Sequence, residues 1–118
     1  NVTAAIVQNA ETSAQKANSD VDKKTRKRME AHFRQTTKQF RDVISKEEKR
    51  METCNQQLSK LETQLSDASL YDAENKKRLN EVLSEQAGCK VELDAIELSW
   101  LDAQEQLEAA SAEFEKSL

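Results

Sequence analysis

Cys54, Cys89 and His32 are the side chains of this 118-residue sequence best suited to nucleophilic or metal chemistry. Two cysteines are too few, and lie too far apart, for a disulfide framework or a zinc site. His32 has no cysteine or other metal-binding partner at helical spacing, so we expect it on the surface. A single glycine also excludes a glycine-rich phosphate loop. The sequence therefore predicts a chain that is not an enzyme and that holds no metal or cofactor of its own.

Basic side chains form the second chemically distinctive group, and they are distributed unevenly. Residues 23–50 contain eleven Lys and Arg against four Asp and Glu, whereas residues 51–118 contain six against fifteen. One role for the basic segment is to face acidic residues of a partner helix, where flanking charges set register and orientation. The other role is contact with a polyanion. The candidate phosphate contacts are Lys23, Lys24, Arg26, Lys27 and Arg28, and then Lys76, Lys77 and Arg78.

The apolar residues predict the elements that carry these charges. In two long segments they follow the alternating four- and three-residue spacing of a heptad repeat, with three polar interruptions. Both cysteines fall on the repeat, which favours a role as small buried hydrophobes. We call the repeat positions the seam residues. They are Phe33, Thr37, Phe40, Ile44, Glu47, Met51, Cys54, Leu58, Leu61 and Leu65, followed by Leu79, Val82, Gln86, Cys89, Leu93, Ile96, Trp100, Ala103, Leu107, Ala110 and Phe114.

Between the two segments lies a hinge, residues 65–72 (LSDASLYD), which is rich in side chains that suit caps and turns. Asp67 and Asp72 are each placed to cap a following helical turn, and we expect Asp72 to cap the second long helix. Leu70 and Tyr71 are placed to close the open end of a helical hairpin. The alternative is one uninterrupted helix with a polar patch, because the heptad phase continues across the stretch unchanged.

A pairing in which residue numbers sum to 147 gives the hairpin a hinge of suitable length. It sets Phe33 beside Phe114, and it leaves the two cysteines in neighbouring layers, which disfavours a disulfide. It also sets Glu47 opposite Trp100, whose indole N–H would donate to the carboxylate. We expect Trp100 to be the largest single anchor of the seam.

Composition supports this architecture. With no proline, 34% charged and 4% aromatic residues, the chain suits long helices with narrow apolar seams. The predicted fold is all-α: two long helices forming an antiparallel coiled-coil hairpin, with arms at about residues 26–66 and 73–116. Residues 1–24 have too few large aliphatic residues to offset the entropy of ordering and are predicted to be a flexible linker. Without an 18-residue apolar run or a signal-peptide pattern, we expect a cytoplasmic and monomeric domain.

Two stretches carry a more specific pattern: residues 58–72 (LSKLETQLSDASLYD) and residues 100–108 (WLDAQEQLE). Together they resemble the C-terminal domain of the ABC-F ATPases, over roughly residues 26–110. The resemblance implies a charged helical hairpin joined to two ATP-binding cassettes, with ATP and Mg²⁺ bound outside this chain. Where the family often has a proline, near Gln39, this chain has none, so its first helix is expected to continue without a kink.

Two functional hypotheses follow. The resemblance implies action on the ribosome or translation, and one relative's domain is associated with DNA binding, so the basic residues would contact ribosomal RNA, DNA or the ribosome. The alternative is a protein-interaction or spacer coiled coil with no nucleic-acid role.

Overall fold

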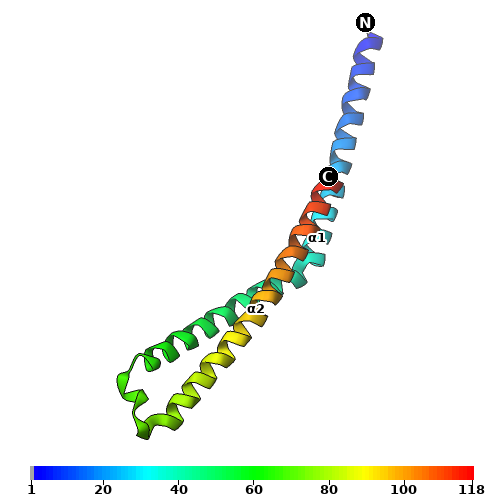
Figure 1. The fold of residues 1–118 in the computed structure, drawn as a ribbon. Coiled ribbons are helices and arrows are strands. Elements are labelled where there is room, and N and C mark those ends of the chain that lie inside the picture. Colours follow the sequence, from blue (N-terminus) through cyan, green and yellow to red (C-terminus); the bar gives the residue numbers. More distant parts are fainter. Residues whose placement is uncertain (1) are drawn as a thin grey trace. The chain divides into compact units, whose positions relative to one another are not determined.

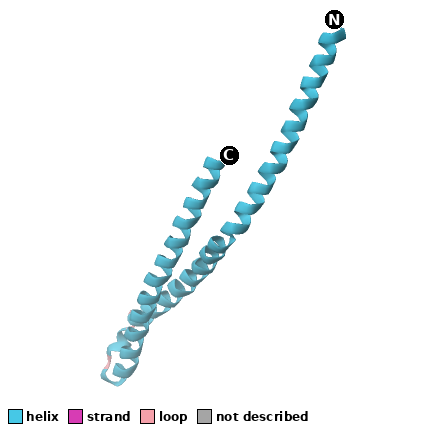
Figure 2. Cartoon of the chain, turned by 90° about the vertical axis from the view of Figure 1, so that its right-hand side faces the viewer, coloured by secondary structure: helices cyan, strands magenta, loops and turns pink. Residues whose placement is uncertain are grey.

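The structure is a computed structural model that describes the fold of residues 2–118, with side chains described from Asp20 onward. Every element of the described chain is helical, and the two long helices confirm the predicted all-α hairpin class. A break of turns and short 3-10 helices separates them, so the alternative of one uninterrupted helix is wrong (Figures 1 and 2). The elements are α1 (Val2–Leu65), η1 (Ala68–Tyr71), η2 (Ala73–Asn75) and α2 (Lys76–Ser117).

The chain divides into two compact units, and each contains part of both long helices. The first unit is residues 1–38 with 110–118, and the second is residues 39–109. The predicted linker, residues 1–24, falls mainly on residues whose side chains lie outside the described part, and it stays a prediction. The backbone of residues 2–24 belongs to α1. In the described helices no stretch combines the length and apolarity needed to cross a bilayer.

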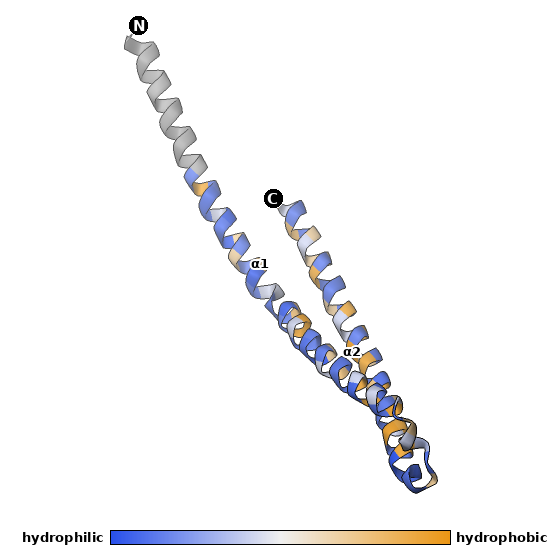
Figure 3. Cartoon of the chain, turned by 90° about the vertical axis from the view of Figure 1, so that its left-hand side faces the viewer, coloured by the Kyte–Doolittle hydropathy of each residue, from blue (hydrophilic) through white to orange (hydrophobic). Residues whose placement is uncertain are grey.

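The predicted seam is confirmed position by position, because every seam residue is buried or half-buried. Leu61, Val82 and Ile96 are at most 1% exposed. In the first unit the rings of Phe33 and Phe114 stack with centroids 4.6 Å apart, as the sum of 147 predicts. Figure 3 shows apolar residues recurring among hydrophilic ones along α2 and along the coloured part of α1. The core of each unit is therefore a line of contacts between two helices and not a thick interior.

Two polar seam residues, Thr37 and Glu47, are buried, at 1% and 3% exposure. The Thr37 hydroxyl donates to the carbonyl of Phe33, with 2.6 Å between the oxygens. The Glu47 carboxylate accepts from the Arg50 guanidinium at 3.0 Å. Because both groups have partners, their burial avoids the cost of an unsatisfied polar group.

The predicted hydrogen bond between Glu47 and Trp100 is wrong. The Trp100 indole instead donates to Glu48 Oε1, 3.2 Å away. Glu47 points into the seam, where Arg50 binds it, whereas Glu48 is exposed beside the seam, where the indole N–H emerges. Trp100 is half-buried, and that it is the largest single anchor stays a prediction; the largest fully buried side chains are Leu61, Ile96, Val82 and Thr37.

Helix α1 ends in a tight turn that both a side chain and the backbone of the hinge close by hydrogen bonds. The Ser66 hydroxyl donates to the carbonyl of Glu62 at 2.9 Å, and the Asp67 N–H turns back to Gln64 at 3.2 Å. Asp67 is the N-cap of η1, as predicted, and accepts from the Ser69 hydroxyl at 2.8 Å and the Ser69 N–H at 3.0 Å. These two hydrogen bonds stabilise the carboxylate and hold the pKa of Asp67 below its ordinary value of 3.8.

The expectation that Asp72 caps the second long helix is wrong. Asp72 is the N-cap of η2, its side chain makes no capping hydrogen bond, and α2 begins only at Lys76. The intervening turn is held instead by Asn75, whose side-chain amide donates to the carbonyl of Ser69 at 2.8 Å.

Leu70 closes the end of the seam, as predicted. It is 8% exposed and packs with Leu61 and Val82, the centre of the buried cluster of the second unit. Tyr71 contributes differently, because the residue is 57% exposed while its hydroxyl donates to the carbonyl of Leu65 at 2.8 Å. Leu70 thus adds buried apolar surface, and Tyr71 stabilises the end of α1 by a hydrogen bond.

Val82 and Val91 offer a matched test of the seam, since the same residue type occurs on one helix at 0% and 70% exposure. We expect Val82→Ala to lower the free energy of unfolding by about 2 kcal/mol, because it removes two buried methyl groups and leaves a cavity. We expect Val91→Ala to be neutral or slightly stabilising, because Ala is the better helix former. Urea unfolding of the 118-residue chain measures both, and equal effects would contradict the seam assignment.

Gly88 is expected to be a weak point of α2 that can be repaired. Its φ is not positive, and a Cβ built on it meets nothing within 4 Å. Gly88→Ala should therefore raise the free energy of unfolding by about 0.5–1 kcal/mol through helix propensity alone. Thermal unfolding checks this, and a loss of stability would mean that the backbone at residue 88 is not regular helix.

Asp67 should make part of the hinge stability depend on acid. Because its folded pKa is depressed, the cap contributes fully above the unfolded value of 3.8 and is lost as the pH falls through the lower folded pKa. Asp67→Asn keeps a capping oxygen without this titration, so it should lose less stability than the parent chain between about pH 6 and about pH 2. Asp72→Asn is the control, since Asp72 makes no capping hydrogen bond; an identical acid response in all three chains would refute the assignment.

Candidate nucleic-acid interface

The first candidate group, Lys23, Lys24, Arg26, Lys27 and Arg28, lies on α1 in the first unit, and all five side chains are exposed. Arg26 pairs with Glu30 one turn along the helix, at 3.4 Å, with the arginine side chain 66% exposed. Such an exposed pair contributes little and is easily exchanged for another anion. At about 100° per residue the five cations cover a little over half of the helix circumference. A single phosphate backbone can therefore meet most of them, but not all five at full reach.

The second candidate group occupies the first turn of α2. Lys76 and Lys77 are exposed, and within the described part of the chain no ion pair is assigned to either. Cations at a helix N-terminus are disfavoured by the macrodipole, by about 0.3–1 kcal/mol each, so Lys76 and Lys77 gain no stability from this position. Its position beside the hinge leaves the two ammonium groups accessible to a partner.

Arg78, the third member of that group, has a structural contact that sequence reasoning missed. Its guanidinium donates to the side-chain oxygen of Gln64 on α1 at 2.8 Å, and it pairs with Glu81 at 3.4 Å and Glu85 at 3.9 Å. Arg78 therefore joins the two helices next to the hinge. No residue pattern predicted this role, because Gln64 and Arg78 meet only once the hinge is formed.

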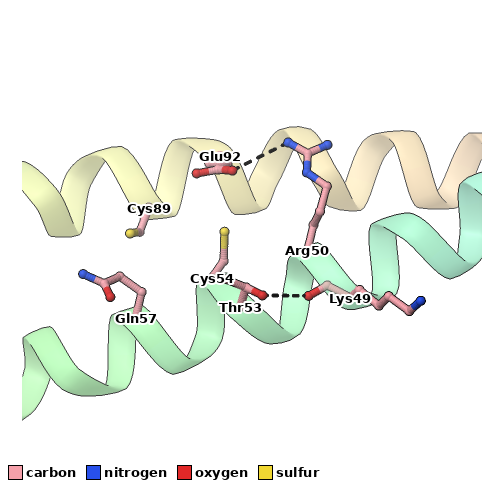
Figure 4. A pocket seen from close by; sticks show the side chains of 7 residues that line it. All are labelled: Lys49, Arg50, Thr53, Cys54, Gln57, Cys89 and Glu92. Carbon is pink, nitrogen blue, oxygen red and sulfur yellow. Dashed lines mark hydrogen bonds and ion pairs between the residues drawn. The ribbon is translucent and has the colours of Figure 1, made fainter.

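Arg50 shows how the basic segment meets the acidic arm. Its guanidinium lies 3.0 Å from Glu47 on its own helix. It also lies 3.6 Å from Glu92 on α2, the contact drawn in Figure 4. The Glu47 hydrogen bond and charge, and to a smaller extent Glu92, raise the pKa of Arg50 above its ordinary value. This contact is an instance of the predicted flanking charges that set the register.

Cys54 and Cys89 extend from opposite helices toward one cavity of about 340 Å³, which Glu92 also lines (Figure 4). Both are free thiols, with Cys54 buried and Cys89 half-buried. Burial, and next the charge of Glu92, raises the pKa of Cys54, so little of it is the reactive thiolate at neutral pH. His32 is exposed, as predicted. Among the residues with described side chains, no three His, Cys, Asp or Glu are grouped so that they could hold a metal.

These features define a class: an antiparallel coiled-coil hairpin domain with exposed charged faces. No protein-family model matches the chain, and no solved structure matches it significantly. Among curated proteins, the Escherichia coli K12 protein named "Probable ATP-binding protein YheS" is 43% identical over 101 residues, 86% of this chain. The Haemophilus influenzae protein of the same name is 48% identical over 42 residues, 36% of the chain.

The chain is therefore homologous to a segment of the YheS proteins. This match is consistent with the predicted resemblance to a C-terminal domain of the ABC-F type. The matched segment is 16% of the Escherichia coli relative and 7% of the Haemophilus influenzae relative. What the chain shares with them is thus one helical part of a much longer protein.

Proposed function

We propose that this chain is a non-catalytic C-terminal domain of a cytoplasmic ABC-F ATP-binding protein, and that it contacts nucleic acid or the ribosome through its basic residues. The nucleic acid would be ribosomal RNA or DNA, and ATP and Mg²⁺ would bind in the remainder of the parent protein. The observation that supports this most is the exposure of five cations within residues 23–28, of which Arg26 alone forms an ion pair with a described residue.

The chemistry of that segment suits contact with the phosphate backbone and not with the bases. Phosphate contacts position a protein on nucleic acid, whereas sequence is read by polar or apolar groups that reach base edges. The described residues from Asp20 to His32 contain no aromatic side chain on which a base could stack. Binding through this segment should therefore tolerate many sequences and depend strongly on salt.

The alternative proposal is a protein-interaction or spacer coiled coil without a nucleic-acid role. It is favoured by Arg50 and Arg78, because the acidic and amide side chains of this same chain already bind both guanidinium groups. If Lys23 to Arg28 served only such internal pairing, removing their charge would change stability and not binding.

Salt dependence distinguishes the two proposals. If three to five of the cations at residues 23–28 neutralise phosphates, the slope of log affinity against log salt for duplex DNA should be about −3 to −4.5. Replacing all five by Gln should flatten the slope toward zero without unfolding the hairpin, because they precede the first seam residue, Phe33. Binding of the 118-residue chain to duplex DNA, ribosomal RNA and ribosomes, measured over a range of salt concentrations, provides the slopes.

Two further variants make the test specific. Lys76→Gln with Lys77→Gln asks whether the tip beside the hinge is the contact surface, and leaves the Arg78 contact in place. Lys46→Gln with Lys49→Gln removes the same two charges as the tip pair, from an exposed part of α1 outside both groups. If this control pair weakens binding as much as the tip pair does, net charge alone explains the effect of the tip pair. If no variant changes binding to any of the three targets, the spacer alternative is correct.

A further inference from the structure

Helix α2 carries a second apolar stripe that the seam does not use. It consists of Leu83, Ala87, Val91, Leu98 and Leu101, spaced by four, four, seven and three residues. At about 100° per residue these positions fall within a sector of about 80°, centred roughly 150° from the seam. Single exposed apolar residues are ordinary on a protein surface, but a row at helical spacing marks an interaction site.

The stripe is open to solvent for its whole length. The exposed fractions of Leu83, Val91, Leu98 and Leu101 are 45%, 70%, 70% and 48%. All four lie in the second unit, and α1 has no comparable row: in its described part, the exposed large apolar residues are Val21 and Val43, 22 positions apart.

The charges around the stripe are mainly acidic. Asp94 lies within it, and Glu97 and Asp102 lie on its two sides. Glu105 lies beyond its end. The only basic residue between Leu83 and Leu101 is Lys90. A second copy of the same face would bring these carboxylates together, which electrostatic complementarity disfavours. A helix with an apolar stripe bordered by Lys and Arg would bring opposite charges together along the same contact.

A cavity at the end of the stripe also favours a basic partner. It measures about 400 Å³ and is lined by Met51, Trp100 and Leu101, with the carboxylate residues Glu48 and Glu97. Leu101 belongs to both the stripe and the cavity, so the two form one surface. A Lys or Arg side chain suits this cavity, because its aliphatic stem can lie on Met51 and Leu101 while its cation meets the indole face and the carboxylates.

We propose that the face of α2 from Leu83 to Leu101 docks a basic amphipathic helix of a partner protein, with one Lys or Arg of that helix seated in the Trp100 cavity. The site shares no residue with the candidate phosphate contacts. It therefore adds a protein-binding surface to the domain, whether or not residues 23–28 bind nucleic acid.

Trp100 provides the readout, because it is the only tryptophan of the chain. The probe is a synthetic, tryptophan-free helical peptide with leucines at positions i, i+4, i+7 and i+11, bordered by Lys and Arg. The matched control peptide has Glu in place of every Lys and Arg. We expect the basic peptide to change Trp100 fluorescence saturably and to bind at least tenfold more tightly than the acidic peptide. Its affinity should fall as the salt concentration rises.

Variants locate the binding on the stripe. Leu98→Gln with Leu101→Gln should lower the affinity for the basic peptide at least tenfold. Glu97→Gln should lower this affinity by a smaller factor. Val91→Gln is an independent test, since this side chain lies outside the cavity. Leu118→Gln is the control, because Leu118 is 60% exposed but lies outside the stripe, and it should leave the affinity unchanged. Circular dichroism confirms that each variant is folded.

Three outcomes would overturn the proposal. One is equal binding of the two peptides, or none. Another is a fluorescence change that the stripe variants leave intact. The third is self-association of the chain in sedimentation that Leu98→Gln with Leu101→Gln abolishes, which would assign the stripe to a second copy. Loss of nucleic-acid binding in the variants at residues 23–28 would not bear on this result, so the two proposals fail separately.

Discussion

The contact of two apolar seams is the constraint on which the structure depends. An isolated helix of this polarity gains little from its own hydrogen bonds, and most helical stability in proteins comes from packing an apolar face. Neither α1 nor α2 can bury its seam alone. The hinge matters because it lets one chain supply both faces, and Leu70 extends the seam into the hinge by packing on Leu61 and Val82. Stability is thus concentrated in a narrow line, which leaves most side chains available for other contacts.

The seam could be predicted from the sequence because burial in a coiled coil is a periodic property. Every seam position is buried or half-buried, including the polar residues Thr37, Glu47 and Gln86. The register was also accessible, since only some pairings leave a hinge of suitable length, and Phe33 does stack on Phe114. A pattern that repeats over many turns averages out the uncertainty at any one position.

Details that depend on a single side chain could not be predicted in this way. Glu47 and Glu48 are adjacent, and both have a side chain long enough to reach an indole on the facing helix. The Trp100 indole donates to Glu48 because Arg50 binds Glu47. The prediction that Asp72 caps the second long helix was wrong for a similar reason. Asp67 and Asp72 have the same capping chemistry, and a turn of 3-10 helix follows each. Asp67 accepts two hydrogen bonds from Ser69, whereas Asp72 makes no capping bond, and Asn75 donates to the carbonyl of Ser69. Competing local hydrogen bonds of similar energy decide such cases.

The charges show the same division between pattern and particular contact. Polarisation of the chain was evident from composition, but composition did not separate the basic residues that serve the fold from those that remain accessible. In the structure Arg50 and Arg78 bind partners on the facing helix, while Lys76, Lys77 and the cations of residues 23–28 stay exposed. Long-range attraction between the basic and acidic segments would have been satisfied by many pairings. Only the geometry of the seam determines which cations lie close enough to a carboxylate or amide to stabilise the fold. The other cations, together with the apolar stripe of α2 that the seam does not use, are available for partners.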